Sequence, residues 1–433
     1  MLSRKNVSSY LILCVTGLFS VLLISLVNNP LVHILTMWCV CVVATFIVKF
    51  DLMHPYVWFS LIFSLYSTGY AILYVMQSRN YGYDYRNVLF SVVALMVVLF
   101  IVGPQRNLQI KNIQYKDDVD YKYLSWVICA LTALTILSSL ILLSRGYSGK
   151  KEMQEANDMF YRFGVYFVRF LTFFLLLRMY NLHSLGKRYR FLIVSSMIAI
   201  VLFGLCTGER DVYIRFFVVF MFYLYSINKI KKRHFILLIP LCAGVLVLSV
   251  GFKYYFSQGV DSEYFTGNLL ETILNSDFYS AGQNLQYLLD RPWTKGHFGF
   301  KTLLTEIFYP ILPSNMKVNL DYWFNYEVHV NEWHGYAFTL VGTGYVIAGI
   351  IGVIAVFAIV GLIIKAVYKR AGRSILSQTI YLYSITIVMI SCRGTLSSYG
   401  NGFLKEILVA CIFKYVMDVL LIRRKKADDY SIE

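Results

Sequence analysis

Charged residues are scarce in this chain. Asp, Glu, Lys and Arg make up 15% of its 433 residues, whereas soluble domains carry about 25%. Hydrophobic residues make up 58%, and the mean hydropathy is +0.61. Apolar runs recur from end to end, each long enough to cross about 30 Å of hydrocarbon as a helix. The composition excludes a water-soluble globule and predicts an all-α polytopic membrane protein.

Several motifs of soluble enzymes are also missing. The eight cysteines lie in or at the edge of apolar runs and form no CxxC pair, which argues against a disulfide framework and against zinc. The sequence has no phosphate-binding P-loop, HExxH, DxD-like pair or GxSxG. We therefore expect no metal and no cofactor. The formal charge of +16 falls largely in short stretches between apolar runs, so it indicates membrane topology and not nucleic-acid binding.

The apolar runs predict about twelve membrane spans. They lie at about 9–27, 31–49, 55–76, 87–104, 123–144, 161–179, 191–207, 212–228, 235–252, 336–364, 378–393 and 402–421. The run at 336–364 is long for one crossing and holds Gly342, Gly344, Gly349 and Gly352. We expect this helix either to project beyond the bilayer or to break near these glycines.

The cations between spans fix an orientation. One alternate set of connecting stretches carries 23 Lys and Arg, counting Arg178 at a helix end, whereas the short stretches of the other set carry six. Cytoplasmic loops hold the excess of Lys and Arg in membrane proteins. Both termini are therefore expected in the cytoplasm.

One connection is much longer than the others. Residues 253–335 form an outer segment of 83 residues with nine acids and three of the six tryptophans. Apolar residues recur at helical spacing within 267–290 and 301–312, which predicts amphipathic helices that lie on the membrane surface and cap the bundle. The expected organisation is nine spans in 1–252, this large loop, and three spans with a cytoplasmic tail in 336–433.

An arginine in the middle of a span is costly and is a functional candidate. Arg169 lies near the centre of 161–179, and Arg162 lies seven residues earlier on the same helix face. Because no span offers a mid-membrane acid for Arg169, an anionic ligand is the favoured partner. The alternative is that Arg169 extends its charge to the membrane surface.

A second arginine follows a glycine turn. Thr207-Gly208-Glu209-Arg210-Asp211 joins two spans, and a guanidinium at a helix N-terminus suits a phosphate. A structural salt bridge of Arg210 with Glu209 or Asp211 is the alternative. The arginines proposed to surround one outward-facing cavity are Arg162, Arg169, Arg210, Arg215 and Arg393.

The large loop supplies the remaining candidates. His334 precedes the tenth span, with Glu332 nearby, and this pair is proposed as a general base. Trp293, Trp323 and Trp333 are interpreted either as interfacial anchors or as platforms on which sugar rings stack.

Three local patterns resemble the Wzy-type polymerases of O-antigen and capsular repeat units, a family related to the O-antigen ligases. Thr207–Arg210 is similar to the family's Gly-x-Arg turn. The stretch from Pro292 to Phe300, followed by Tyr309 to Lys317, is similar to its loop segment. Phe338 to Val353 is similar to the entry into the span after the loop.

The resemblance implies a GT-C-like, multi-pass glycosyltransferase of the bacterial inner membrane with a periplasmic loop. Its substrate would be an undecaprenyl-pyrophosphate-linked oligosaccharide, and a chain-length regulator would be a possible partner. Polymerisation would take place on the periplasmic face. Two alternatives stay open: an O-antigen ligase, and a flippase or transporter of lipid-linked oligosaccharides.

Overall fold

The computed structural model describes residues 4–76, 82–107, 110, 122–147, 150–181, 187–234, 278–328 and 338–430. Within these ranges the regular structure is entirely helical. Seven helices are long and apolar enough to cross a membrane, and two shorter apolar helices join them, Arg86–Val102 and Ile375–Ser391. The expected helical membrane protein is confirmed at this level, whereas twelve spans, their orientation and the periplasmic loop stay predictions.

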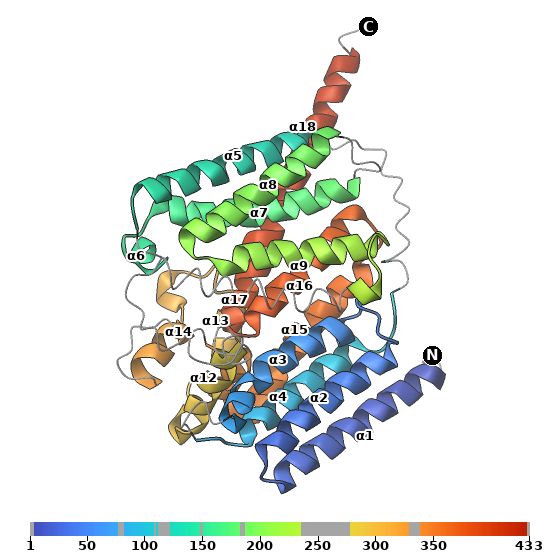
Figure 1. Cartoon of the computed structure of the whole chain (residues 1–433), viewed down its shortest axis with the longest axis vertical. Helices are drawn as coiled ribbons and strands as arrows, with labels where there is room; N and C mark the ends of the chain where they lie inside the picture. The colour runs from blue at the N-terminus through green and yellow to red at the C-terminus, as the bar shows by residue number, and fades with distance from the viewer. Residues whose placement is uncertain are drawn as a thin grey trace. The chain divides into compact units, whose positions relative to one another are not determined.

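The chain forms two compact units. Unit 1 comprises residues 1–115 and 218–399, and unit 2 comprises residues 116–217 and 400–433. Unit 1 contains α1 (Arg4–Leu26), α2 (Pro30–Ile47), α3 (Pro55–Val75), α4 (Arg86–Val102), α12 (Tyr279–Leu289), α13 (Lys301–Ile307), α14 (Leu320–Trp323), α15 (Leu340–Arg370) and α16 (Ile375–Ser391), with the short helical segments η4 (Pro292–Thr294), η5 (Ser314–Met316) and η6 (Phe324–Val328). Figure 1 shows α1, α2, α3 and α4 side by side at its blue end.

Unit 2 contains α5 (Lys122–Ser144), α6 (Lys150–Glu155), α7 (Met159–Asn181), α8 (Lys187–Thr207), η7 (Gly402–Leu408) and α18 (Val409–Tyr430). Helices α9 (Arg210–Ser226) and α17 (Leu396–Asn401) each cross the boundary between the units. Every expected span coincides with a helix or a run of consecutive helical segments, apart from 235–252, which lies outside the described residues.

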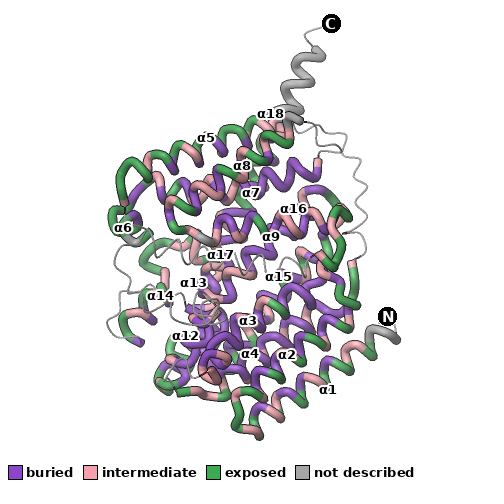
Figure 2. Tube along the Cα trace, viewed as in Figure 1, coloured by how far each residue is buried: buried purple, intermediate pink, exposed green. Residues whose placement is uncertain are grey.

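Burial separates a central helix from a peripheral one in unit 1. Most side chains of α3 are buried, whereas α1 exposes large apolar side chains along its length, among them Leu11, Leu18 and Leu22 (Figure 2). Such exposure is unfavourable in water and neutral against lipid tails. The pattern therefore fits a bundle in which α3 is central and α1, which packs on α2 and α4, faces lipid.

Helix starts follow local sequence signals. Asn29 accepts a hydrogen bond from the backbone N–H of Leu31 at 2.9 Å, and Pro30 occupies the first helical position of α2. At α3 the ring of His54 accepts from the N–H of Tyr56 at 3.1 Å, with Pro55 first in the helix. Each cap accepts a hydrogen bond from a backbone N–H that has no partner within the helix. Proline has no N–H, but at the first helical position this costs no hydrogen bond.

Helix α15 breaks at its glycines, which was one of the two expected outcomes. Ala348 and Gly349 have non-helical dihedral angles, and the φ of Gly349 is +60°. A Cβ added at Gly352 would lie 2.0 Å from the carbonyl oxygen of Gly344, so the two halves approach as closely as glycine alone allows.

Backbone N–H groups of the loop after η4 satisfy the carbonyl groups that this break releases. The N–H of Gly296 donates to Tyr345 O at 3.1 Å, and the N–H of Phe298 donates to Val346 O at 3.0 Å. A buried backbone carbonyl needs such a partner. The loop after η4 therefore supplies the backbone hydrogen bonds that α15 lacks at its break.

Helix α12 is more deeply buried than an amphipathic surface helix. Its glycine, Gly282, lies against Tyr70 of α3, and the Asn87 amide donates to Gly282 O at 2.7 Å. Nine of its eleven residues are buried. Helices α3, α4 and α15 pack against it, and its position at the membrane surface stays a prediction. Helix α13 fits the expectation better, since Leu304 is 61% exposed and Ile311, beyond its end, is 68% exposed.

Candidate functional site: a buried charge cluster

Four charged side chains meet inside unit 2. Arg169 of α7 lies 2.9 Å from Glu406 of η7 and 3.6 Å from Asp211 of α9. Arg215 lies 3.0 Å from the second oxygen of Glu406 and 3.4 Å from Asp211. Two cations and two anions thus alternate in a closed arrangement, which we call the charge cluster.

Local structure places each member of the cluster. Asp211 and Arg215 are one turn apart on α9, so their side chains share a face. The turn before α9 contains Gly208 at a φ of +68°, a conformation that favours glycine. Glu406 lies in η7, a π-helical segment. Segments of this kind are rare and frequently occur at functional sites.

The cluster is nearly closed to solvent. Glu406 exposes 3% of its side chain and Arg215 exposes 8%, whereas Arg169 exposes 22%. A charge without a partner would be very costly at this depth. Arg169 is therefore the member that a ligand can reach with the least rearrangement.

The prediction that Arg169 has no protein carboxylate to pair with is wrong. Glu406 is recognisable in the sequence as an acid within the last span, but hydropathy does not tell which helices are neighbours. The structure brings η7 against α7, and the ion pair joins residues 237 positions apart. A signal was available: an intrahelical arginine and an intrahelical acid in one chain can compensate each other.

A second group of polar side chains lies at the turn between α8 and α9. Glu209 pairs with Lys150 of α6 at 2.9 Å and accepts a hydrogen bond from the Tyr161 hydroxyl of α7. Burial raises the pKa of the Glu209 carboxyl, and the nearby carboxylate of Asp211 raises it further. Lys150 acts in the opposite direction, because its positive charge favours the ionised form of Glu209.

Asp158 fixes the start of α7, the helix that carries Arg169. Its carboxylate accepts the backbone N–H of Phe160 at 2.7 Å and the Tyr147 hydroxyl at 2.9 Å, and it pairs with Arg145. Burial acts to raise the pKa of Asp158, but these donors together outweigh it and lower the pKa. The cap is therefore ionised at neutral pH and anchors α7.

Of the other three candidate arginines, the structure describes the side chains of Arg162 and Arg393 but not that of Arg210. Arg162 is exposed on α7. Arg210 begins α9, but its side chain lies outside the described residues. Arg393 is half-buried and follows α16 in unit 1. A single cavity surrounded by all five arginines therefore stays a prediction. Glu332, Trp333 and His334 also lie outside the described residues, so the proposed general base is untested.

The structure brings two of the predicted tryptophans together. Trp293 and Trp323 lie with their ring centroids 5.9 Å apart, and His297 stacks on Trp323 at 5.3 Å. Trp293 is 50% exposed, whereas Trp323 is 9% exposed. This arrangement offers one open aromatic face, compatible with either an interfacial anchor or a sugar platform. His297 was not among the predicted site residues.

A buried carboxyl group of the outer segment was also missed. Glu306 of α13 accepts the backbone N–H of Ser397, in α17, at 2.9 Å, and is 1% exposed. Burial raises its pKa to about 8. Glu306 falls within the predicted amphipathic run at 301–312, and its contact with Ser397 becomes visible only in the folded chain.

Across the part of the chain that the structure describes, no three His, Cys, Asp or Glu residues are grouped as metal ligands. The charge cluster instead offers guanidinium groups, which bind phosphate oxygens in pairs. No protein-family model matches the chain, no curated protein matches it, and no solved structure matches it.

Proposed function

We propose that this chain is a glycosyltransferase that polymerises oligosaccharide repeat units linked to undecaprenyl pyrophosphate. The reaction would take place on the periplasmic face of the bacterial inner membrane, with both termini in the cytoplasm. The observation that carries the proposal is the charge cluster, in which two guanidinium groups are held among apolar helices and one of them, Arg169, is partly exposed.

The cluster has the chemistry that a pyrophosphate leaving group needs. Arg169 makes one close contact with Glu406 and a longer one, at 3.6 Å, with Asp211. A phosphate oxygen can replace the longer contact while Glu406 continues to hold Arg215. A fixed guanidinium then stabilises the charge that develops as the bond to pyrophosphate breaks.

The reaction balances without a nucleotide. A hydroxyl oxygen of the acceptor unit forms a bond to the anomeric carbon of the donor glycan. The bond from that carbon to pyrophosphate breaks, and its electron pair leaves with undecaprenyl pyrophosphate. The hydroxyl proton passes to a base, for which His334 with Glu332 is the proposed pair.

The proposal is tested with purified chain in lipid nanodiscs and lipid-linked repeat units from the source cells. A polymerase converts single units into a ladder of longer products. In cells, loss of polymer with single units still attached to the lipid core after deletion of the gene also indicates a polymerase. A capped lipid with nothing attached would indicate a ligase instead.

One observation favours a second candidate, a transporter of lipid-linked oligosaccharides. Transporters often combine a discontinuous helix with buried charges, and α15 is broken at Gly349. A transporter would leave the lipid-linked unit unchanged in nanodiscs, and its deletion would abolish the periplasmic intermediate. The same two assays therefore separate the candidates.

A further inference from the structure

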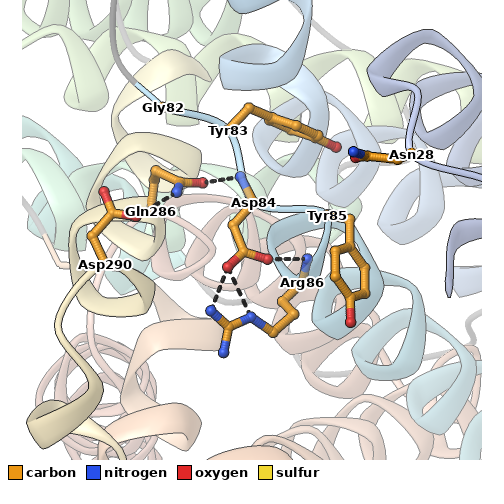
Figure 3. A pocket seen from close by; sticks show the side chains of 8 residues that line it. All are labelled: Asn28, Gly82, Tyr83, Asp84, Tyr85, Arg86, Gln286 and Asp290. Atoms are coloured by element: carbon orange, nitrogen blue, oxygen red, sulfur yellow. Dashed lines mark hydrogen bonds and ion pairs between the residues drawn. The ribbon is translucent and has the colours of Figure 1, made fainter.

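An open cavity lies in unit 1, apart from the residues considered so far. Its volume is about 570 Å³, within the range of small-ligand sites. Three segments line it: the turn between α1 and α2, the turn before α4, and one face of α12. The lining residues are Asn28, Gly82, Tyr83, Asp84, Tyr85, Arg86, Gln286 and Asp290 (Figure 3).

Hydrogen bonds within the wall hold these side chains in place. Asp84 accepts the Nε–H of Arg86 at 2.8 Å, and its own backbone N–H donates to the amide oxygen of Gln286 at 3.0 Å. The nitrogen of the same amide donates to Asp290 at 2.8 Å. Gln286 thereby connects the turn before α4 to the end of α12. A wall fixed in this way loses little entropy when a ligand binds.

The Tyr83 ring, which also lines the cavity, is held by its own contacts. The Tyr83 hydroxyl is hydrogen bonded to Nδ1 of His33 at 2.8 Å, and its ring stacks on Tyr74 at 5.3 Å. In Figure 3 this ring extends toward Asn28. Tyr85, by contrast, is 40% exposed, so part of its ring is accessible to a ligand.

The charges of the wall select among ligand classes. Arg86 compensates Asp84, so Asp290 leaves the lining with one formal negative charge. That balance disfavours a phosphate, and the pairing of Asp84 with Arg86 leaves too few carboxylate oxygens for a cation cage. Amide, carboxylate and phenol groups beside an aromatic face suit a ligand with many hydroxyl groups.

We infer that this cavity binds a short oligosaccharide, the saccharide part of the repeat unit. The inference rests on the proposed function for the identity of the sugar, and on the lining residues for the class of ligand. Asp290 accepts hydrogen bonds from sugar hydroxyls, and the Tyr85 ring packs against the apolar face of a sugar. Each of the three segments lies on the outer side in the topology that the cations predict.

The inference is tested by saturation-transfer NMR and calorimetry on the full chain in nanodiscs. The probe is the set of repeat-unit oligosaccharides released by mild acid from the surface polysaccharide of the source cells. We expect Asp290→Ala and Tyr85→Ala each to weaken binding about tenfold, the cost of losing one good polar or aromatic contact. Glu327→Ala is the control, since Glu327 is an exposed acid of the same outer segment that does not line the cavity.

Folding is checked by thermal unfolding of each variant. If Asp290→Ala aggregates, Asp290→Asn replaces it, because the asparagine side chain keeps an oxygen that accepts from Gln286. We expect Asp290→Asn to weaken oligosaccharide binding as well. Absence of binding to the wild type, or wild-type affinity in both the Asp290 and Tyr85 variants, would overturn the inference.

The tests of the proposed polymerase activity and of the saccharide cavity can fail independently of each other. Arg169→Lys is expected to lose polymerisation and to keep oligosaccharide binding. Binding without any polymerisation by the wild type would refute the polymerase and leave the saccharide site in place. Polymerisation without oligosaccharide binding would refute the cavity alone.

Discussion

The two units use polar side chains in opposite ways. In unit 2, Arg169, Arg215, Asp211 and Glu406 compensate one another among apolar helices. In unit 1, hydrogen-bonded side chains of the turn before α4 and of α12 line an open cavity. A buried charge must be paired to be stable, whereas a polar wall facing water can keep binding capacity. This difference supports the proposed charge stabilisation in unit 2 and the inferred recognition of hydroxyl groups in unit 1.

The largest expected effect concerns the acid at the centre of the cluster. Glu406→Ala leaves two guanidinium groups of the cluster with Asp211 as their one shared carboxylate, and we expect a loss of about 3–5 kcal/mol in the free energy of unfolding. Reversible unfolding in mixed micelles measures it. Asp418→Asn in α18 is the control, because the Asp418 carboxyl is 24% exposed, against 3% for Glu406, and its loss should cost less. Equal losses would remove the distinction between the charge cluster and a partly exposed ion pair of the same unit.

The second effect concerns activity. Arg169→Lys keeps a cation beside Glu406 but cannot hold two phosphate oxygens with a planar group. We expect polymerisation to fall about 10²-fold or more with near-normal protein abundance. Arg190→Lys, an exposed arginine of α8, should polymerise normally. The readout is the chain-length ladder of surface polysaccharide, and a full ladder from Arg169→Lys would contradict the account.

A third change tests the broken helix of unit 1. Gly352→Ala places a Cβ 2.0 Å from the carbonyl oxygen of Gly344, so the two halves of α15 must separate. We expect a loss of about 1–3 kcal/mol, typical of overpacking. Gly299→Ala has the strained φ of +69° but open space around it, and it should cost about 1 kcal/mol. Thermal unfolding distinguishes the two, and a reversed order would argue against the close approach.

The last prediction concerns the pH dependence of stability. The Glu306 pKa of about 8 lies above its unfolded value, so the native state retains a proton that the unfolded chain releases. This contribution to stability is fully present below the unfolded pKa and is lost as the pH rises toward 8. Glu306→Gln, which mimics the protonated form, should flatten that loss. Parallel stability curves of wild type and variant between pH 5 and about 8 would contradict the prediction.

The sequence predicts the individual helices of this fold better than it predicts which helices contact each other. Apolar runs mark the helices because length and hydropathy are local properties, and the glycines of 336–364 indicated a possible break for the same reason. The partner of Arg169 was missed because an ion pair between α7 and η7 depends on which helices meet. The cavity was missed for a similar reason, since Asn28, Asp84 and Asp290 are brought together only by folding.

The central claim is that the charge cluster binds a pyrophosphate through Arg169. The most direct measurement is the affinity of undecaprenyl pyrophosphate for the chain in nanodiscs, compared between wild type and Arg169→Lys at equal folded concentration. We predict saturable binding by the wild type and at least about tenfold weaker binding by the variant, the cost of one bidentate contact. Equal affinity for the two proteins, or no saturable binding by the wild type, would contradict the account.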